Sequence, residues 1–254
     1  MDEVNVILNS MTPISLEAMN EVRLMNRIDT KYLFTRESLL KVLAEVSQHY
    51  YVQEIDGRRM ASYRTVYCDT TDLIMYHIHH NKKLNRDKVR FRSYVDSGIS
   101  FCEVKHKSHK GRTKKERIKI VSEDFLSLSS EMVRDFLAAA QPYPVDMLRP
   151  SLETVFDRIT LVNKEKTERL TMDCNLRFHN CQTAGEDNMG SLVVVELKQD
   201  GRHYSHFKEV LSRLRIKPFK MSKYCIGICL TNDSVKRNRF KPKLRAIERL
   251  KNEK

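Results

Sequence analysis

The chain has 254 residues, and its 46 Lys and Arg exceed its 33 Asp and Glu, which gives a formal net charge of +13. With 41% hydrophobic residues, 7 Gly and 6 Pro, the composition excludes collagen-like and disordered classes. No apolar run approaches the roughly 18 residues of a membrane-spanning helix, and the N-terminal segment lacks the basic start and apolar core of a secretory signal. Six scattered cysteines in a chain of this size predict reduced thiols and a cytoplasmic location.

The first third of the chain predicts short helices between strands. Cap residues before apolar stripes mark the helix starts, and alternating apolar and polar residues mark the strands. The expected elements are a helix from Ser15 to about Arg23, a strand over 29–34, a helix over 36–47 capped by Thr35, paired strands over 50–55 and 62–68 around Asp56-Gly57, and a helical turn after Asp69 that ends near Asn81.

The rest of the chain predicts mostly strands. Alternation indicates strands over 88–95, 100–107 and 114–121, the first two joined by a hairpin turn at Asp96-Ser97-Gly98. Further elements are expected in the order helix 122–140, strands 155–162, 168–178 and 192–198, and helices 204–216 and 222–230. About eight strands with few helices between them predict an α+β fold, with one antiparallel barrel or sandwich and helices packed outside.

The positive charge is concentrated in two segments. Residues 82–119 hold 14 Lys and Arg against 4 Asp and Glu, a local charge of 14 − 4 = +10. Residues 236–254 hold 9 against 2, a local +7, with apolar residues spaced as in an amphipathic helix. We expect this tail to be a solvated or domain-packed helix rather than a membrane anchor. The central block indicates an anionic partner.

The polar faces of the strands carry mostly one sign of charge. Lys88, Arg90 and Arg92 share one face of their strand, and Val89 and Phe91 share the other. The same alternation groups Glu103 with Lys105, Lys115 with Arg117 and Glu196 with Lys198, while Arg158 and Arg169 are expected to begin two further strands.

This pattern has two interpretations. In the first, the charged face is an outer face in water, although like charges opposite each other destabilise a strand pair. In the second, the barrel is inverted: the apolar residues face outward under covering helices, and the charges line a bore that holds a polyanion and a divalent cation. The strand pattern alone leaves both open.

Six short motifs follow one another along the chain. They are Arg27-Ile-Asp-Thr-Lys31-Tyr32, Lys88-Val-Arg90-Phe-Arg92-Ser-Tyr, Phe101-Cys-Glu103-Val-Lys105, Lys114-Lys-Glu-Arg117, Val195-Glu196-Leu-Lys198 and Lys220-Met-Ser222-Lys223-Tyr224. In this order they resemble the catalytic domain of the vacuolar transporter chaperone (VTC) family, the polyphosphate polymerases of the triphosphate tunnel metalloenzyme (CYTH-like) superfamily. The resemblance runs from about residue 25 to residue 230.

The resemblance implies an eight-stranded antiparallel β-barrel that forms a tunnel, with helices packed on the outside. It implies one domain over 1–254, with a tunnel core over about 25–230 and a basic C-terminal helix over about 236–254. The implied reaction transfers the γ-phosphate of ATP to a polyphosphate chain and releases ADP, with Mn²⁺ or Mg²⁺ as the cofactor.

The resemblance also implies a set of site residues. The catalytic set is Lys31, Arg90, Arg92, Lys105, Lys220, Ser222 and Lys223. The phosphate-binding lining is completed by Lys115, Arg117, Arg158, Arg169 and Lys198. Glu196 is the implied metal ligand, and Glu103 is either a second ligand or an internal counter-charge for Lys105 or Arg90.

The chain departs from the family pattern at two points. The wider superfamily opens with an E-x-E-x-K strand, where this chain has Arg27-Ile-Asp-Thr-Lys31 and therefore fewer acidic metal ligands. Phe156 stands where a tyrosine is expected in the strand of Arg158, which removes one hydroxyl contact.

Other functions stay open at this point. A tripolyphosphatase or nucleoside triphosphatase would use the same residues with water as the attacking group, and a polyphosphate-binding module would need no metal ligand. We do not expect nucleic acid as a partner, because only Phe91 and Tyr94 are interleaved with the basic residues as stacking groups. The expected partners are ATP and polyphosphate or triphosphate, and a separate membrane protein is left open.

Overall fold

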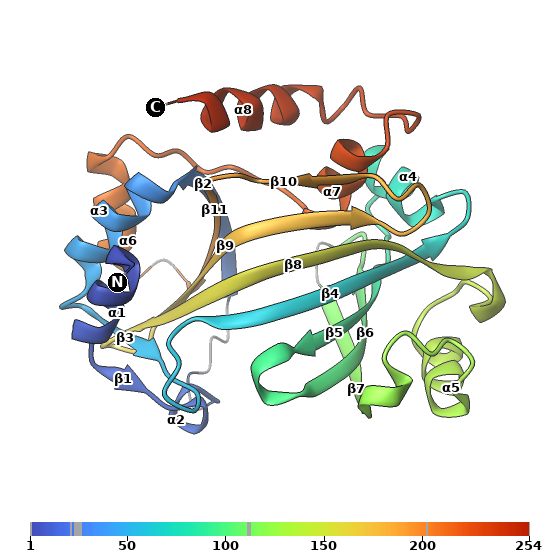
Figure 1. Cartoon of the computed structure of the whole chain (residues 1–254), viewed down its shortest axis with the longest axis horizontal. Helices are drawn as coiled ribbons and strands as arrows, with labels where there is room; N and C mark the ends of the chain where they lie inside the picture. The colour runs from blue at the N-terminus through green and yellow to red at the C-terminus, as the bar shows by residue number, and fades with distance from the viewer. Residues whose placement is uncertain (1, 21, 23–26, 111–112, 202, 254) are drawn as a thin grey trace.

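The computed structural model describes residues 2–20, 22, 27–110, 113–201 and 203–253. One large sheet runs through the molecule, with helices around it (Figure 1). The strands are β1 (Pro13–Ile14), β2 (Arg27–Thr35), β3 (Tyr50–Gln53), β4 (Ala61–Thr70), β5 (Val89–Tyr94), β6 (Ile99–Lys107), β7 (Thr113–Ile120), β8 (Leu148–Asn163), β9 (Glu168–Asn180), β10 (Glu186–Asn188) and β11 (Leu192–Asp200). The helices are α1 (Glu3–Ser10), α2 (Leu16–Asn20), α3 (Arg36–Val46), α4 (Ile74–His80), α5 (Glu131–Ala140), α6 (His206–Arg213), α7 (Lys223–Thr231) and α8 (Lys241–Asn252).

The main path of the sheet contains eight strands in the order β2-β11-β9-β8-β4-β5-β6-β7. Every neighbouring pair on this path is antiparallel. The predicted α+β fold, an antiparallel sheet with helices packed outside, is therefore confirmed. The expected closure of the eight strands into a barrel is not seen: within the described ranges no hydrogen-bonded pairing joins β7 to β2, so the sheet stays open along this seam.

The outer face of the sheet is apolar and covered by helices. At one end, α1, α3 and α6 pack over Leu170, Val195 and Leu197. At the other end, side chains of α5 join a cluster with Val89 and Phe91, and Phe91 is fully buried. Because side chains alternate along a strand, the charged residues between these positions lie on the inner face. This is the inverted arrangement rather than a charged outer face in water.

Helix α7 covers the apolar half of the inner face. It packs on Leu152 of β8 and Phe178 of β9. A Cβ on Gly227 would lie 2.5 Å from Leu152 and 2.6 Å from Phe178, so glycine is required for this close approach. The N-terminal residue of α7, Lys223, reaches the polar half of the face.

One predicted strand pairing is wrong. β3 and β4 do not pair with each other around Asp56-Gly57, because β3 pairs with β1 and β8, and β4 pairs with β5 and β8. The predicted turn itself is present, since Ile55 and Arg58 exchange two backbone hydrogen bonds of 2.9 Å around Asp56-Gly57. The pairing does not continue beyond it: the Arg59 guanidinium donates to the carbonyl oxygens of Leu8 and Met11 at the end of α1. Such a contact between distant parts of the chain leaves no mark in the local pattern.

The start of one further strand also differs from the prediction. β8 begins at Leu148 rather than near residue 155, so Arg158 lies well inside its strand. Pro150 is accommodated opposite Cys68, next to the point where the register between β4 and β8 shifts.

Two helix starts can be explained, one by a cap residue and the other by the backbone conformation before the helix. Ser15 accepts the Ala18 amide at 3.2 Å, as predicted for a cap, whereas the predicted end of this helix at Arg23 lies outside the described residues. The predicted helix over 122–140 begins only at Glu131. Leu126 has a φ of 71°, which interrupts a right-handed helix.

The predicted basic C-terminal helix is α8. Figure 1 shows it along the outside of the molecule, above β10 and α7 in this view. Its apolar side is held by the buried Ile247, with Leu244 and Leu250 packed against the same cluster. Among the described helices, none has the length and hydrophobicity that crossing a membrane requires.

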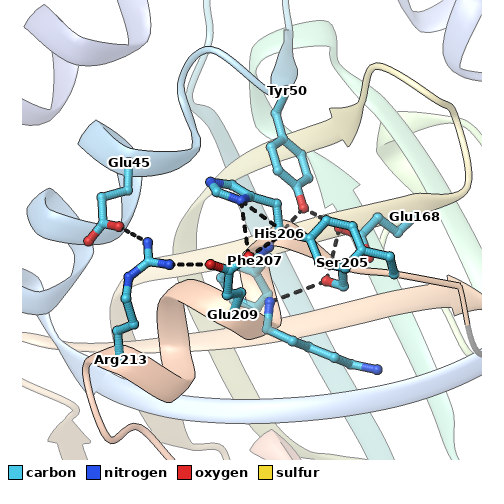
Figure 2. Close-up of polar contacts among 10 residues, drawn as sticks. Glu45, Tyr50, Glu168, Ser205, His206, Phe207, Glu209 and Arg213 are labelled. Atoms are coloured by element: carbon cyan, nitrogen blue, oxygen red, sulfur yellow. Dashed lines mark hydrogen bonds and ion pairs between the residues drawn. The ribbon is translucent and has the colours of Figure 1, made fainter.

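A buried carboxylate joins β9 to α6 on the outer side. Figure 2 shows the Tyr50 hydroxyl and Ser205 directed toward Glu168. Tyr50 donates to Glu168 Oε1, Ser205 Oγ donates to the same oxygen at 3.1 Å, and the Phe207 amide donates to the Tyr50 hydroxyl at 3.3 Å. Glu168 is 1% exposed, and burial raises its pKa more than these hydrogen bonds lower it.

Glu168→Gln is expected to stabilise the fold at neutral pH by on the order of 1 kcal/mol. The folded-state pKa is raised, so the native state favours the protonated acid. The contribution of Glu168 to the free energy of unfolding is complete below its unfolded pKa of about 4.3, and it is lost as pH rises through the raised folded-state pKa. Gln resembles the protonated acid, so the gain in melting temperature is expected at about pH 8 and should shrink near pH 4. Thermal melts across this range measure this gain, with the exposed Glu123→Gln as the control. An equal gain at both ends of the range would contradict the assignment.

Candidate functional site

Strand alternation brings most of the predicted residues onto the inner face. We call this surface the charged face. It carries Lys31 of β2, Glu196 and Lys198 of β11, Arg169 and Asp173 of β9, Arg158 of β8, Arg90 and Arg92 of β5, Glu103 and Lys105 of β6, and Lys115 and Arg117 of β7. The register places Lys31 opposite Glu196, and Arg90 opposite Glu103.

The charged face curls toward itself. Burial alone would raise the pKa of Glu196, but the positive charges of Lys31, Lys198, Arg158 and Lys105 outweigh it and lower the pKa to about 2. Lys105 lies on β6 and Glu196 on β11, near opposite ends of the strand order. A polyanion on this face would therefore meet cations from both sides.

Glu196 is held loosely between two lysines. Lys31 Nζ lies 3.7 Å from Oε1, and Lys198 Nζ lies 3.5 Å from Oε2. Burial lowers the pKa of Lys198 to about 8 even though Glu196 counteracts it. Glu196 is thus an ionised carboxylate whose two oxygens make only long ion pairs, which leaves them able to bind a cation.

Glu103 is bound more tightly than Glu196. Its side chain is 1% exposed, Arg90 Nη2 lies 2.6 Å from Oε2, and Lys115 forms an ion pair with Oε1. Burial would raise its pKa, but Arg90, Arg92 and Lys115 lower it to about 2. This geometry favours the counter-charge role, with Arg90 and Lys115 as the partners rather than Lys105.

A third carboxylate, Asp173, was missed by the sequence reasoning. Arg158 donates to it through Nε at 2.6 Å and Nη2 at 2.9 Å, and Lys223 Nζ lies 2.7 Å from Oδ2. Lys223 Nζ also lies 2.9 Å from the centroid of the Phe156 ring. Phe156 therefore replaces the expected tyrosine hydroxyl with a cation–π contact. The available signal was the alternation of Arg169 and Asp173 along one strand.

Lys88, just before β5, was placed on the charged strand face by the alternation but was left out of the implied site residues. Its Nζ donates to Ser222 Oγ at 3.0 Å, and Ser222 caps α7 by accepting the Cys225 amide at 3.4 Å. Burial lowers the pKa of Lys88 to about 8. The N-terminus of α7 thus adds a favourable helix dipole to the lysines around it, an arrangement that suits phosphate. The contact with Ser222 makes Lys88 a further member of the site.

Several cations of the charged face have no acidic partner. Within the part of the chain that the structure describes, no carboxylate lies within ion-pair distance of Lys88, Arg92, Lys105, Arg117 or Arg169. Arg92 is only 9% exposed and donates to Thr65 Oγ1 at 3.2 Å. Arg169 Nε is buried and has no hydrogen-bond partner among the residues that the structure describes. Lys220, in contrast, is exposed, and its charge acts on Lys243 of α8.

The donor set fits a divalent cation that is shared with phosphate. Among the described residues no group of three or more His, Cys, Asp or Glu side chains could hold a metal by itself. Mg²⁺ and Mn²⁺ accept one or two carboxylates when phosphate oxygens and water supply the other ligands. Glu196, beside Lys31 and Arg158, meets this requirement.

Comparisons with known proteins give one family. The profile of the VTC domain family matches residues 26–232. No curated protein matches the chain. Among solved structures, a protein from Bacillus halodurans provisionally described as an adenylate cyclase is similar, with a TM-score of 0.49 and 16% identity over 78% of this chain and 96% of that chain. A Hippeastrum protein, provisionally described as an adenylyl cyclase and reported to have a dominant triphosphatase activity, gives a TM-score of 0.49 and 11% identity over 80% and 95% of the two chains.

Proposed function

This chain belongs to the VTC domain family, and on that premise we propose that it is a polyphosphate polymerase that transfers the γ-phosphate of ATP to a polyphosphate chain. The charged face would be the tunnel that holds both substrates. The six cysteines, all free thiols, support a cytoplasmic location.

One observation carries the proposal: buried cations without acidic partners on the charged face. Taking a charge out of water costs several kcal/mol unless a partner compensates it. Arg92, which is buried, and Arg169, whose Nε is buried, are such groups. Burial lowers the pKa of both, and the charges of neighbouring arginines, Arg158 among them, lower it further. A bound chain of phosphates would supply the missing negative charge.

The chemistry needs positioning more than a protein nucleophile. A terminal oxygen of the polyphosphate chain would attack the γ-phosphorus of ATP. One P–O bond forms, the bond between that phosphorus and the β,γ-bridging oxygen breaks, and ADP leaves with the electron pair. Arg90, Arg92 and Arg158 would hold phosphate oxygens through paired N–H donors, and Lys31 would act as a point charge.

A divalent cation on Glu196 would neutralise charge that develops on the transferred phosphate. Glu103 and Asp173 would keep Arg90 and Arg158 in place, because each carboxylate is shared between two cations. A triphosphatase, with water as the attacking group, is the second candidate, since the same cations would bind its substrate.

The deciding assay incubates the purified protein with ATP and Mn²⁺ and measures polyphosphate, ADP and free phosphate. A polymerase gives polyphosphate with ADP and little free phosphate. A triphosphatase gives free phosphate, and a binding module gives neither product. Omission of the metal and addition of a chelator are the controls.

We also expect the protein to bind tripolyphosphate far more tightly than monophosphate. A longer anion contacts more of the cations and displaces more counterions, so the affinity should fall steeply as salt rises. Calorimetric titrations at several salt concentrations test this. Equal binding of the two anions, or binding that salt does not weaken, would argue against a polyanion tunnel.

A further inference from the structure

Basic residues continue beyond the end of the charged face. Lys88 and Lys105 exchange backbone hydrogen bonds at 3.0 and 2.9 Å, and the next rung joins Arg86 to Lys107 at 3.1 and 2.9 Å. Residues two apart on an extended strand lie on the same side. Arg86 therefore continues the row of Arg90 and Lys88 on the charged face, beyond the N-terminal end of β5, and Lys107 lies beside it at the end of β6.

Helix α8 brings another lysine to the same place. The Arg239 amide donates to His80 Nε2 at 3.3 Å, and the Phe240 ring packs edge-on against His80, with centroids 5.4 Å apart. These contacts dock the start of α8 on the end of α4. Lys243, one turn further along α8, lies 5.9 Å from the Phe240 ring centroid. We call Lys82, Arg86, Lys107 and Lys243 the basic rim.

The histidine beside this docking point shows how closely the rim is grouped. Burial, followed by the positive charges of Lys88, Arg86, Lys243 and Lys107, lowers the pKa of His79 to about 3. Lys82 and the predicted site residue Lys220 in turn act on Lys243. The rim thus borders both the last residue of the row, Lys88, and the segment before α7.

The rim lacks acidic partners, unlike much of the surface. Among the residues that the structure describes, no ion pair involves Lys82, Arg86, Lys107 or Lys243, whereas elsewhere exposed cations pair with carboxylates, as Arg213 does with Glu45 and Glu209. Like charges held together without compensation repel one another. A rigid docked helix and a strand rung that keep them together indicate a binding surface for an anion.

We propose that the basic rim binds the part of a polyphosphate chain that extends beyond the tunnel, so that the protein discriminates between long and short chains. The inference rests on the proposed function, because it takes the charged face to hold the inner phosphates. Tripolyphosphate is short enough to be held by the charged face alone. Long-chain polyphosphate would gain additional contacts with Arg86, Lys107 and Lys243.

The test compares two triple variants of the full chain. The rim variant is Arg86→Gln, Lys107→Gln and Lys243→Gln. The control variant removes the same charge elsewhere: Lys41 lies in α3, Lys164 in the β8–β9 turn and Arg215 just after α6. These elements lie at the opposite end of Figure 1 from α4 and α7. Binding of long-chain polyphosphate and of tripolyphosphate is measured by calorimetry at several salt concentrations.

For long-chain polyphosphate we expect the rim variant to bind about tenfold more weakly at low salt, with a salt slope reduced by about 2 for three lost contacts. Its tripolyphosphate affinity and the long-chain affinity of the control variant should change less than about twofold. The proposed role of the rim is wrong if the rim variant binds long chains like the wild type, or if its affinities for long chains and for tripolyphosphate fall equally. It is also wrong if the control variant loses as much affinity for long chains as the rim variant. If the wild type binds neither anion, the proposed function itself fails.

Discussion

Glu196→Gln is expected to abolish metal-dependent turnover while phosphate binding persists. The change removes a hard anionic oxygen ligand but retains the size of the side chain. Loss of metal stabilisation is worth several kcal/mol of transition-state energy, which corresponds to about 10²-fold or more in rate. Metal-free tripolyphosphate binding should hold or tighten, because Lys31 and Lys198 lose the carboxylate that now competes for them at 3.7 and 3.5 Å.

Two measurements separate these effects: product formation from ATP with Mn²⁺, and calorimetric binding of tripolyphosphate without metal. Glu186→Gln, on exposed β10, is the matched control and should behave like the wild type. Normal metal-dependent activity of Glu196→Gln would show that the metal ligand is elsewhere, and Glu103 would be the next residue to examine. Loss of both activity and metal-free binding would indicate a folding defect, which a thermal melt detects.

Phe91→Ala and Arg92→Ala are expected to have opposite effects, although the residues are adjacent. Phe91 is fully buried on the outer face and meets the Phe125 ring edge-on at 6.1 Å between centroids, so its loss should cost about 3–5 kcal/mol of stability. Arg92 belongs to the charged face and has no carboxylate partner among the described residues. Burial, Arg90 and Arg158 lower its pKa. Its removal should leave stability unchanged or raised, and should cost about 1.5–3 kcal/mol of tripolyphosphate binding.

Arg90→Ala provides an internal comparison. Arg90 forms an ion pair with the buried Glu103 at 2.6 Å, so its loss is expected to reduce both binding and stability. Paired thermal melts and binding isotherms on the three variants test the set. The inverted face is refuted if Arg92→Ala binds tripolyphosphate normally while Phe91→Ala melts like the wild type.

Much of the site could be predicted because it depends on local periodicity. Strand alternation alone puts Arg90 and Arg92 on the face opposite Phe91, since side chains on a strand point to alternating faces. The predicted caps are local for the same reason: Ser15 and Thr35 each accept an amide from the first turn of the following helix. The order of the short motifs indicated the family, and the family profile matches the same region.

The sequence could not show which way the charged face points or what closes it. Asp173 finds Arg158 and Lys223 only because the sheet curls and α7 lies against it, and Lys88 meets Ser222 across 134 positions of sequence. The pairing of β3 with β8 and the docking of α8 on α4 likewise depend on contacts between distant segments. Local patterns specify which face a residue occupies, whereas the curvature of the sheet and the packing of its helices decide which faces meet. The charges at Glu196 and Lys105 therefore become neighbours only in the folded chain.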